Sequence, residues 1–211
     1  MPWRPKVPSP TWRTFLRNHL PDIAAIDMFV VATATFRLLY TLIVLSLDRR
    51  RVVHFEVTPN PTQNWLSRQM TEAFPWDNVP RYLLRDRDKS YGPAFRHRVR
   101  AMGITEVITA PRSPWQNPYA ERLIGSIRRE CLDYVIPLSE KHLRTILREW
   151  VGHYNRGRPH ASLGPGIPDS DSRPRPCPSI HRHELPGDCR IRARDVFGGL
   201  HHEYWLEEIA A

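Results

Sequence analysis

The hydrophobic and polar positions divide most of the chain into strand-like and helix-like segments. Long apolar runs rich in β-branched and aromatic residues come first, and two shorter runs follow after a polar interval. They predict strands at 23–33, 36–48, 50–58, 81–86 and 104–110. Apolar residues three and four positions apart predict helices at 62–74, at 93–103, around Glu121 and at 139–155.

The predicted order β-β-β-α-β-α-β-α-α limits how the strands can pair. Strands with short connections most simply form an antiparallel meander, whereas strands separated by helices add in parallel. We therefore expect an α/β fold with a five-stranded mixed sheet, three antiparallel strands and then two parallel ones, flanked by helices. Thr62 is the expected N-cap of the first of these helices.

The composition changes on both sides of this predicted core. Residues 1–20 form a basic lead-in that contains Pro and Trp, residues 21–165 form the core, and residues 166–211 form a tail. Pro and Arg dominate the tail, which is typical of a linker or of a partly disordered segment. Near its end, VFGGLHHEYW predicts a short strand or a docking segment.

The stretch 28–51 also resembles a membrane span, because its apolar residues are followed by three arginines. Against this, Arg37 would lie inside the span at a cost of roughly 2.5–3.5 kcal/mol on the insertion scale. The stretch is rich in strand-forming residues and divides at ATATFR, which predicts a hairpin turn. Two buried strands explain it better than a membrane helix.

Charge and cysteine usage narrow the class of partner and compartment. The chain has 31 Lys and Arg against 22 Asp and Glu, a net charge of +9, which favours a polyanionic partner such as nucleic acid. Nearly all of these cations are arginines, whose planar fork suits phosphate, although a GC-rich genome would also enrich arginine. Three cysteines without framework spacing and the lack of a secretory pattern predict a reducing, cytoplasmic location.

A zinc site is one interpretation of the C-terminal segment CPSIHRHELPGDC. Cys177, His181, His183 and Cys189 are the residue types that bind zinc. Their spacing is irregular and the segment is Pro-rich, so scattered surface side chains explain them better.

Three acids occupy positions that favour a site. Asp27 lies inside an apolar strand, where a carboxylate is costly unless it is paired or binds a cation. Asp86 ends the fourth strand, and α/β sites are commonly built at strand ends. If these strands are neighbours, a crossing helix can bring Glu121 to both acids, and the three carboxylates would suit Mg²⁺ or Mn²⁺. Singly, each acid could equally be a turn cap, an internally hydrogen-bonded group or a solvated side chain.

The helix around Glu121 has an apolar arc and a basic one. The apolar arc consists of Leu123, Ile124, Ile127 and Cys131. Glu121 lies at its edge, nearly in line with Arg128, while Arg122 and Arg129 lie farther round. This pattern predicts that the acid binds a metal and that the arginines position a polyanion.

Four sequence blocks carry a resemblance to a known family. They are AIDMF, RDRDKSYGPAF with MGI, APRSPWQNPYAERLIGSIRREC, and YNRGRPHASL. In this order and spacing they resemble the catalytic core of DDE transposases and retroviral-type integrases, and most of all the integrase-core transposases of bacterial insertion sequences. The resemblance extends from about Pro21 to Pro168.

The resemblance implies a ribonuclease-H-like fold in which an Asp-Asp-Glu triad holds two Mg²⁺ ions, with Mn²⁺ as a substitute. By matching, the triad is Asp27, Asp86 and Glu121. The implied reaction is DNA strand cleavage at the ends of an element, followed by attack of the freed 3′-hydroxyl on target DNA. The implied partners are these two DNAs, bound by an oligomer of identical chains.

The same matching gives a set of DNA-contacting residues. Phosphate contacts are expected from Arg112, Arg122, Arg128 and Arg129. Gln116 and Asn117 match the amide-rich turn before the Glu121 helix, where they either touch DNA or cap the helix. The later motif contains Tyr154, Asn155, Arg158 and His160, for which fold support and DNA contact are expected.

Two departures from the family pattern leave alternatives open. Asp88 replaces a glycine found two residues after the second acid in many relatives, so either Asp86 or Asp88 could be the ligand; Asp86 is preferred because it ends the strand and has Tyr91 five positions on. Such transposases usually carry an N-terminal helix-turn-helix region, which we expect this chain to lack. The alternatives to an active core are therefore a truncated, non-catalytic DNA-binding remnant and a ribonuclease-H-like nuclease of another type.

Overall fold

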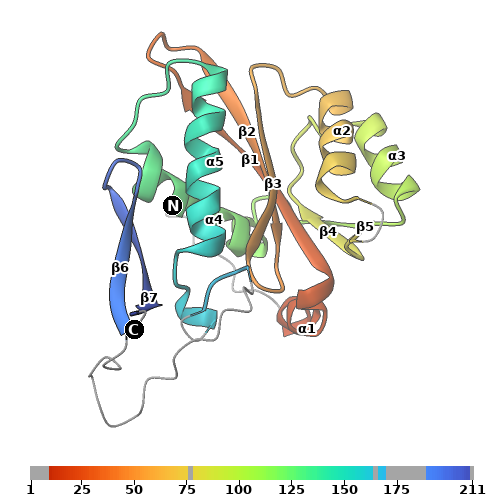
Figure 1. The fold of residues 1–211 in the computed structure, drawn as a ribbon. Coiled ribbons are helices and arrows are strands. Elements are labelled where there is room, and N and C mark those ends of the chain that lie inside the picture. The colour runs from red at the N-terminus through yellow and green to blue at the C-terminus, as the bar shows by residue number, and fades with distance from the viewer. Residues whose placement is uncertain (1–9, 76–77, 164–165, 170–188, 210–211) are drawn as a thin grey trace, which may run out of the picture. The chain divides into compact units, whose positions relative to one another are not determined.

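The computed structural model describes residues 10–75, 78–163, 166–169 and 189–209 (Figure 1). The chain forms two compact units, Met1–Leu147 and Arg148–Ala211. The helix α5 (Glu140–Arg156) begins in the first unit and ends in the second. The predicted division into lead-in, core and tail stays a prediction.

The first unit is built on one five-stranded sheet with the order β3-β2-β1-β4-β5. The strands are β1 (Ile23–Ala32), β2 (Leu38–Ser46), β3 (Arg51–Thr58), β4 (Tyr82–Arg85) and β5 (Thr105–Ile108). The β1–β2 and β2–β3 pairs are antiparallel, and the β1–β4 and β4–β5 pairs are parallel. This confirms the predicted mixed sheet.

The turn between β1 and β2 lies where the sequence predicted it. The amide of Thr33 donates to the carbonyl of Arg37 at 2.9 Å, and Phe36 has a positive φ of 59°. The stretch that resembled a membrane span therefore forms two paired strands. None of the helices in the described ranges is long and apolar enough to cross a bilayer.

One face of the sheet is covered by α2 (Gln63–Ala73) and α3 (Pro93–Ala101), which lie side by side in Figure 1. Thr62 caps α2 as predicted, because its hydroxyl oxygen accepts from the amide of Trp65 at 3.2 Å. Alternate residues of three strands join these helices in one core: Ala24, Ile26, Leu42, Val44, Leu66, Met70, Ala73, Phe74, Leu83, Tyr91, Phe95, Val99 and Ile104.

The helix α4 (Pro118–Ile127) packs on β1 and β2. Its buried residues are Ala120, Leu123, Ser126 and Ile127, which confirms most of the predicted apolar arc. Residues Arg128–Leu132 continue it as a π-helical turn that buries Cys131. The strand residues that α2 and α3 leave free, such as Ala25 and Phe29, are also buried, as expected for a sheet with helices on both faces.

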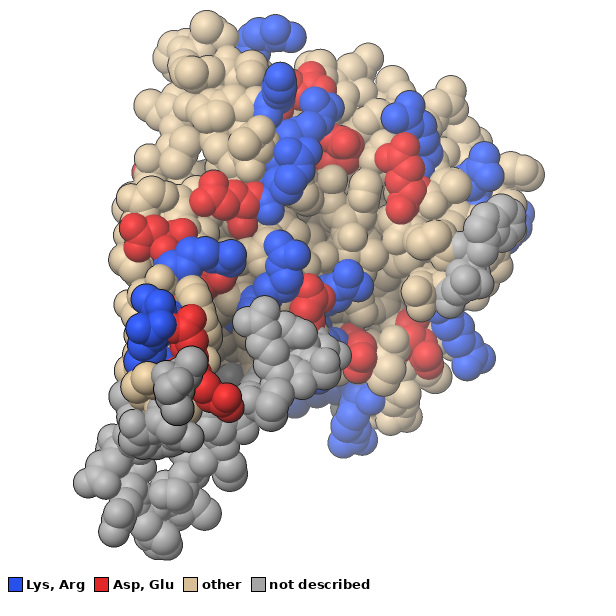
Figure 2. All heavy atoms as spheres, in the orientation of Figure 1, with Lys and Arg blue, Asp and Glu red and all other residues tan. Residues whose placement is uncertain are grey.

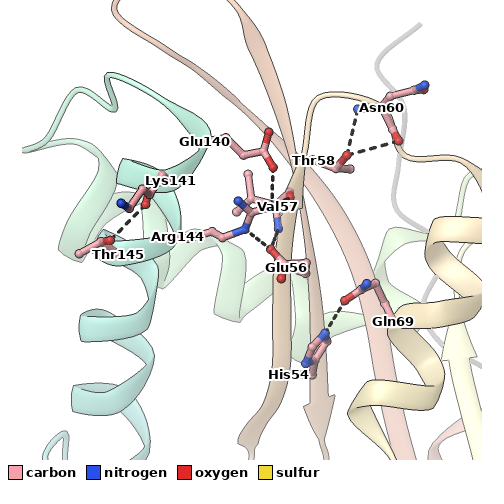
Figure 3. A network of polar contacts seen from close by, with 10 residues as sticks. All are labelled: His54, Glu56, Val57, Thr58, Asn60, Gln69, Glu140, Lys141, Arg144 and Thr145. Carbon is pink, nitrogen blue, oxygen red and sulfur yellow. Dashed lines mark hydrogen bonds and ion pairs between the residues drawn. The ribbon is translucent and has the colours of Figure 1, made fainter.

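Polar contacts on β3 tie two helices to the edge of the sheet (Figure 3). Arg144 of α5 contacts both Glu56 and Glu140 and donates to the carbonyl of Val57 at 2.8 Å. Nε2 of His54 lies 2.7 Å from the side-chain oxygen of Gln69 on α2. The outer strand is therefore fixed by side chains as well as by its ladder with β2.

The second unit contains the end of α5 and a hairpin of β6 (Cys189–Val196) and β7 (His201–Glu208). The segment predicted as a short strand is thus part of a two-stranded sheet. The prediction of partial disorder covers the tail, residues 166–211, of which 170–188 and 210–211 lie outside the described residues. In the lead-in, α1 (Pro10–His19) is a helix that the sequence pattern did not reveal.

Candidate active site

Asp27 is a half-buried acid in the middle of β1. Its Oδ1 accepts a hydrogen bond from the amide of Met28 at 2.8 Å. Burial is the largest cause that raises the pKa of Asp27 from 3.8 to about 7, and the Met28 amide opposes it. The negative charges of Asp86, Glu121 and Asp88 raise the pKa further. The anion is therefore destabilised here, and a nearby cation would relieve it.

Asp86 lies beside Asp27 because of the parallel register of the two strands. Ala25 on β1 is opposite Leu84 on β4, and each acid follows its strand residue by two positions. Side chains alternate with a period of two along a strand, and Asp86 is the first residue after β4, so the alternation continued by one residue puts it on the face and at the level of Asp27. The neighbouring strands that the sequence analysis required are confirmed.

Asp86 and Asp88 share one turn after β4 but differ in exposure. Oδ1 of Asp86 accepts from the amide of Asp88 at 3.1 Å, and Oδ1 of Asp88 accepts from the amide of Ser90 at 2.7 Å. Asp86 is half-buried, whereas Asp88 is exposed. The charge of Asp86 also raises the pKa of Asp27 more than the charge of Asp88 does. This placement favours Asp86 as the partner of Asp27.

Glu121 reaches the same region from α4, and Asn117 fixes where that helix begins. Nδ2 of Asn117 donates to the carbonyl of Ile26 at 3.2 Å, and the amide of Glu121 donates to the carbonyl of Asn117 at 3.2 Å. At the other end of α4, the guanidinium of Arg128 lies 5.7 Å from the ring centroid of Phe29. Glu121 is exposed and lies between these two anchors along β1.

The charges of two other acids, Asp86 and Glu121, therefore act on Asp27, but the three side chains do not form a complete metal site. Among the described residues, no group of three or more His, Cys, Asp or Glu side chains could hold a metal ion as it stands. Carboxylate oxygens are nevertheless the donors that a hard divalent cation prefers. The carboxylate donors therefore fit such a cation. The raised pKa of Asp27 fits it too, because a bound cation would offset the negative charges around this carboxylate.

Arg85 was not predicted as a site residue, yet it supports the end of β4 from inside. Its side chain is 4% exposed, and its Nη2 lies 2.6 Å from Oε2 of Glu106 on β5. Nη1 donates to the carbonyl of Asp86 at 2.8 Å. The sequence signal was an arginine within the apolar run YLLRD, comparable to the acid within AIDMF.

The predicted phosphate-binding arginines are at the surface of the first unit. Arg112, Arg122, Arg128 and Arg129 are all exposed. On the face drawn in Figure 2, however, Lys and Arg are interspersed with Asp and Glu, so the described residues of this face present no continuous basic surface. Contact with phosphate stays a prediction for these four residues.

The two amide side chains before α4 have partners inside the fold. Oε1 of Gln116 accepts from the amide of Ala110 at 2.6 Å and so closes the loop after β5. Asn117 is 4% exposed, and it does not cap α4 through its side chain. The structure gives both residues positioning roles, while their contact with DNA stays a prediction.

The later motif lies in the second unit, where it mainly supports the fold. Tyr154, Asn155 and His160 are buried, and the Tyr154 ring packs against that of His160 at 4.6 Å. Arg158 is half-exposed, with its guanidinium 5.9 Å from the Tyr154 ring centroid. Of the zinc candidates, Cys189 begins β6 and the other three lie outside the described residues.

Comparisons with known proteins show what the chain is similar to. Residues 102–168 match the integrase core domain family. A 39.2 kDa protein of insertion element IS476 from Xanthomonas euvesicatoria is 29% identical over 155 residues, which are 71% of this chain and 44% of that protein. A 31.7 kDa protein of insertion element IS407 from Burkholderia multivorans is 26% identical over 147 residues, 67% of this chain and 52% of that protein. The chain thus spans about half the length of these two relatives.

Solved structures support the fold. The catalytic domain of the Mos1 mariner transposase has a TM-score of 0.57 and 16% identity, over 71% of this chain and 85% of that one. A chain of the simian T-cell lymphotropic virus intasome in complex with PP2A regulatory subunit B56 gamma has a TM-score of 0.61 and 14% identity, over 89% and 67%. These likenesses confirm the predicted ribonuclease-H-like fold. The chain is therefore similar to integrase core domains over residues 102–168 and to two insertion-element proteins over 155 and 147 residues.

Proposed function

We propose that this chain is the catalytic core of a transposase that cleaves DNA strands and transfers them to target DNA with Mg²⁺. Asp27, Asp86 and Glu121 hold the metal, with Mn²⁺ as a substitute. When bound, a pair of such cations supplies an activated nucleophile and stabilises the leaving oxygen of an in-line displacement at phosphorus. The DNA acted on comprises the element's ends and the target, bound by an oligomer of identical chains.

The residues of the chain would contribute binding and orientation. Asp27 and Asp86 hold their carboxylates at one level of the sheet because their strands are parallel neighbours. Glu121 adds a third carboxylate from a helix that Asn117 anchors to β1. Around them, the exposed Arg122, Arg128 and Arg129 hold the phosphate backbone, which positions DNA without reading its bases.

One observation carries this proposal: Asp86 and Glu121 both lie close enough to Asp27 for their charges to raise its pKa. Residues 27, 86 and 121 are far apart in the sequence and come from two strands and one helix. A cluster of like charges around a buried acid is costly unless the protein uses it to bind a cation. The family that the chain resembles gives that cation an expected task.

The test removes each charge without changing side-chain volume. We expect Asp27→Asn and Glu121→Gln to abolish Mg²⁺-dependent joining of a pre-cleaved oligonucleotide end to plasmid DNA. A metal site supplies several kcal/mol of transition-state stabilisation, so the loss should be on the order of 10³-fold or more. The exposed Asp133→Asn is the matched control and should join DNA at the wild-type rate.

Strand joining that survives Asp27→Asn or Glu121→Gln would reject the triad. A wild-type chain that binds duplex DNA but neither cleaves nor joins it in Mg²⁺ or Mn²⁺ would instead be the non-catalytic remnant. Gel-shift titration beside the joining reaction distinguishes these two results.

A further inference from the structure

Large apolar side chains are exposed where the β1–β2 turn meets the loop before α5, in the described part of the first unit. Phe36 (87% exposed) and Leu38 (54%) belong to the β1–β2 hairpin, and Ile136 (70%) and Leu138 (67%) belong to the loop. We call these four residues the apolar patch. Single exposed apolar residues are common, but a group of them on one surface marks an interaction site.

The hairpin and the loop are held together by their backbones. The amide of Ala34 donates to the carbonyl of Pro137 at 2.9 Å. Pro137 is buried while its neighbours Ile136 and Leu138 are exposed, so the loop packs on the fold through the proline and leaves these two side chains in solvent. The part of Figure 2 where the turn and the loop of Figure 1 lie, at the upper left, is largely tan and therefore poor in charged side chains. The apolar patch is thus one preformed surface.

Phe36 is displayed by a closed turn. The carbonyl of Thr33 accepts from the amide of Phe36 at 2.9 Å, and Oγ1 of Thr33 accepts from the amide of Arg37 at 3.1 Å. Phe36 has a positive φ of 59°, a conformation that is rare for a bulky side chain. Such conformations cost about 1–3 kcal/mol and are concentrated at functional sites. A turn that keeps an aromatic ring exposed at this cost points to a partner that covers the ring.

The chemistry of the apolar patch fits a second copy of this chain better than it fits DNA. Phosphates are bound by cations, and Arg37 is the one charged residue of the turn 33–37. Across a two-fold axis the same side chains lie on both sides, so an apolar surface matches itself, whereas a basic surface would repel itself. The four side chains present on the order of 500 Å², and two copies would therefore bury roughly 1,000 Å², the lower limit of a specific interface.

We propose that two copies of the chain associate through the apolar patch, with the ring of Phe36 at the centre of the contact. The inference rests on the proposed function in one respect, because it names the surface through which the identical chains bound to DNA meet. An interface of this size is reversible. The net charge of +9 makes two copies repel each other, so added salt should strengthen their association by screening, although it weakens binding to DNA.

The experiment measures the mass of the full chain without DNA, by sedimentation over a series of protein concentrations. We expect the wild type to change from monomer to dimer as the concentration rises. Phe36→Asn removes the ring and keeps the turn, because asparagine tolerates a positive φ. It should raise the dissociation constant of the dimer on the order of 10-fold or more, and Ile136→Ser should raise it as well.

Phe197→Asn is the matched control. Phe197 is also a phenylalanine in a hairpin turn with a positive φ, of 55°, but it belongs to the second unit. This variant should associate like the wild type. The melting temperature shows that each variant is folded, and Phe36→Asn should melt at the wild-type temperature or above it, since the strained phenylalanine has been replaced.

The outcomes separate this inference from the proposed function. A wild type that stays monomeric, or a dimer that survives in folded Phe36→Asn and Ile136→Ser, overturns the role of the apolar patch and leaves the three acids untouched. Variants with the mass of the wild type but weaker binding to duplex DNA in a gel shift would show that DNA covers this surface, which also overturns the inference. A dimer that is lost in both variants, from a wild type that joins no DNA strands, would reject the proposed function and support the interface.

Discussion

At the scale of single residues, the second acid of the site is decided by two carboxylates in one turn. Asp86 follows β4 directly and shares the face of Asp27, whereas Asp88 is exposed and its Oδ1 accepts from the amide of Ser90. The sequence left these two acids as alternatives, with Asp86 preferred, because Asp88 stands where many members of the family that the chain resembles have a glycine. The strand register separates them. It places Leu84 opposite Ala25, so the residue at the level of Asp27 is the one two positions after Leu84, which is Asp86 and not Asp88.

We therefore expect Asp86→Asn to abolish strand joining and Asp88→Asn to retain most of it. The reason is that Asp86 can share a cation with Asp27, while the charge of Asp88 acts on Asp27 more weakly. Parallel assays of both variants at saturating Mg²⁺ make the comparison. If Asp88→Asn is the inactive variant, the second ligand has been assigned to the wrong residue.

One predicted site residue stood out in the sequence because its type conflicts with its setting. Asp27 is an acid in an apolar strand, and that conflict alone drew attention to it. Arg85 shows the same conflict, but its meaning depends on Glu106, which lies on β5. The register places Leu83 opposite Glu106 on parallel strands, and no local pattern contains that information.

At the scale of elements, the position of α4 relative to β1 determines whether Glu121 can join the two aspartates. The Asn117 side chain makes the described hydrogen bond between the start of α4 and the carbonyl of Ile26, at 3.2 Å. Leu123 and Ile127 of the helix are buried, and apolar packing of this kind is not directional. The hydrogen bond from Asn117 is directional, so we expect it to fix the start of α4, and with it Glu121, relative to β1.

Two substitutions of Asn117 should distinguish the loss of this hydrogen bond from electrostatic repulsion between a new carboxylate and the Ile26 carbonyl. Asn117→Ala removes one buried hydrogen bond and should lower the free energy of unfolding by about 1–2 kcal/mol. Asn117→Asp puts a carboxylate opposite the Ile26 carbonyl and close to two acids, so it should destabilise more than alanine does. Urea unfolding at pH 7.5 measures both, with the exposed Asn60→Asp as a control expected within about 0.5 kcal/mol of wild type.

An Asn117→Asp chain as stable as Asn117→Ala would contradict the described orientation, in which the amide nitrogen faces Ile26.

The elements themselves were mostly predictable. The strand-forming runs gave all five strands of the sheet, and helical spacing gave α2, α3, α4 and α5, with boundaries shifted by a few residues. The helix α1 was missed because its short segment, with Pro10 and Trp12 near the start, shows little of the apolar helical pattern.

At the scale of the whole molecule, the hairpin of β6 and β7 contacts α5, although the two are far apart in the sequence. In the second unit, Nδ1 of His153 on α5 lies 2.9 Å from Oε1 of Glu203 on β7. The amide of Phe197 in the hairpin turn donates to Oε1 of Glu149 at 2.7 Å. Gly157 permits the approach, because a Cβ at this position would lie 2.1 Å from Oε1 of Glu203. The Pro- and Arg-rich composition of the tail predicted none of these contacts.

This docking of the hairpin on α5 should depend on acid. Burial would raise the pKa of Glu203, but hydrogen bonds from His153 and Arg194 outweigh it and lower the pKa below 4.5. A carboxyl group whose pKa is lower in the folded than in the unfolded state stabilises the folded state at pH values above its unfolded-state pKa. This stabilisation is lost as the pH falls through the folded-state pKa. We therefore expect the hairpin to stay docked from neutral pH down to about pH 4.5 and to loosen below it.

The amide resonance of Phe197 in ¹⁵N correlation spectra reports this docking, since its partner is Glu149 of α5. In the wild type this resonance should move toward its undocked position only below pH 4.5, whereas in Glu203→Gln it should lie there already at neutral pH. Glu207 is the control, because it pairs with Arg190 and Arg192 inside the hairpin and touches no residue of α5 in the described contacts. Glu207→Gln should therefore keep the wild-type profile. A Phe197 resonance that is equally docked in Glu203→Gln would show that other contacts hold the hairpin on α5, such as the stacking of the His201 ring on that of His153, and any acid dependence would then have to come from other carboxylates.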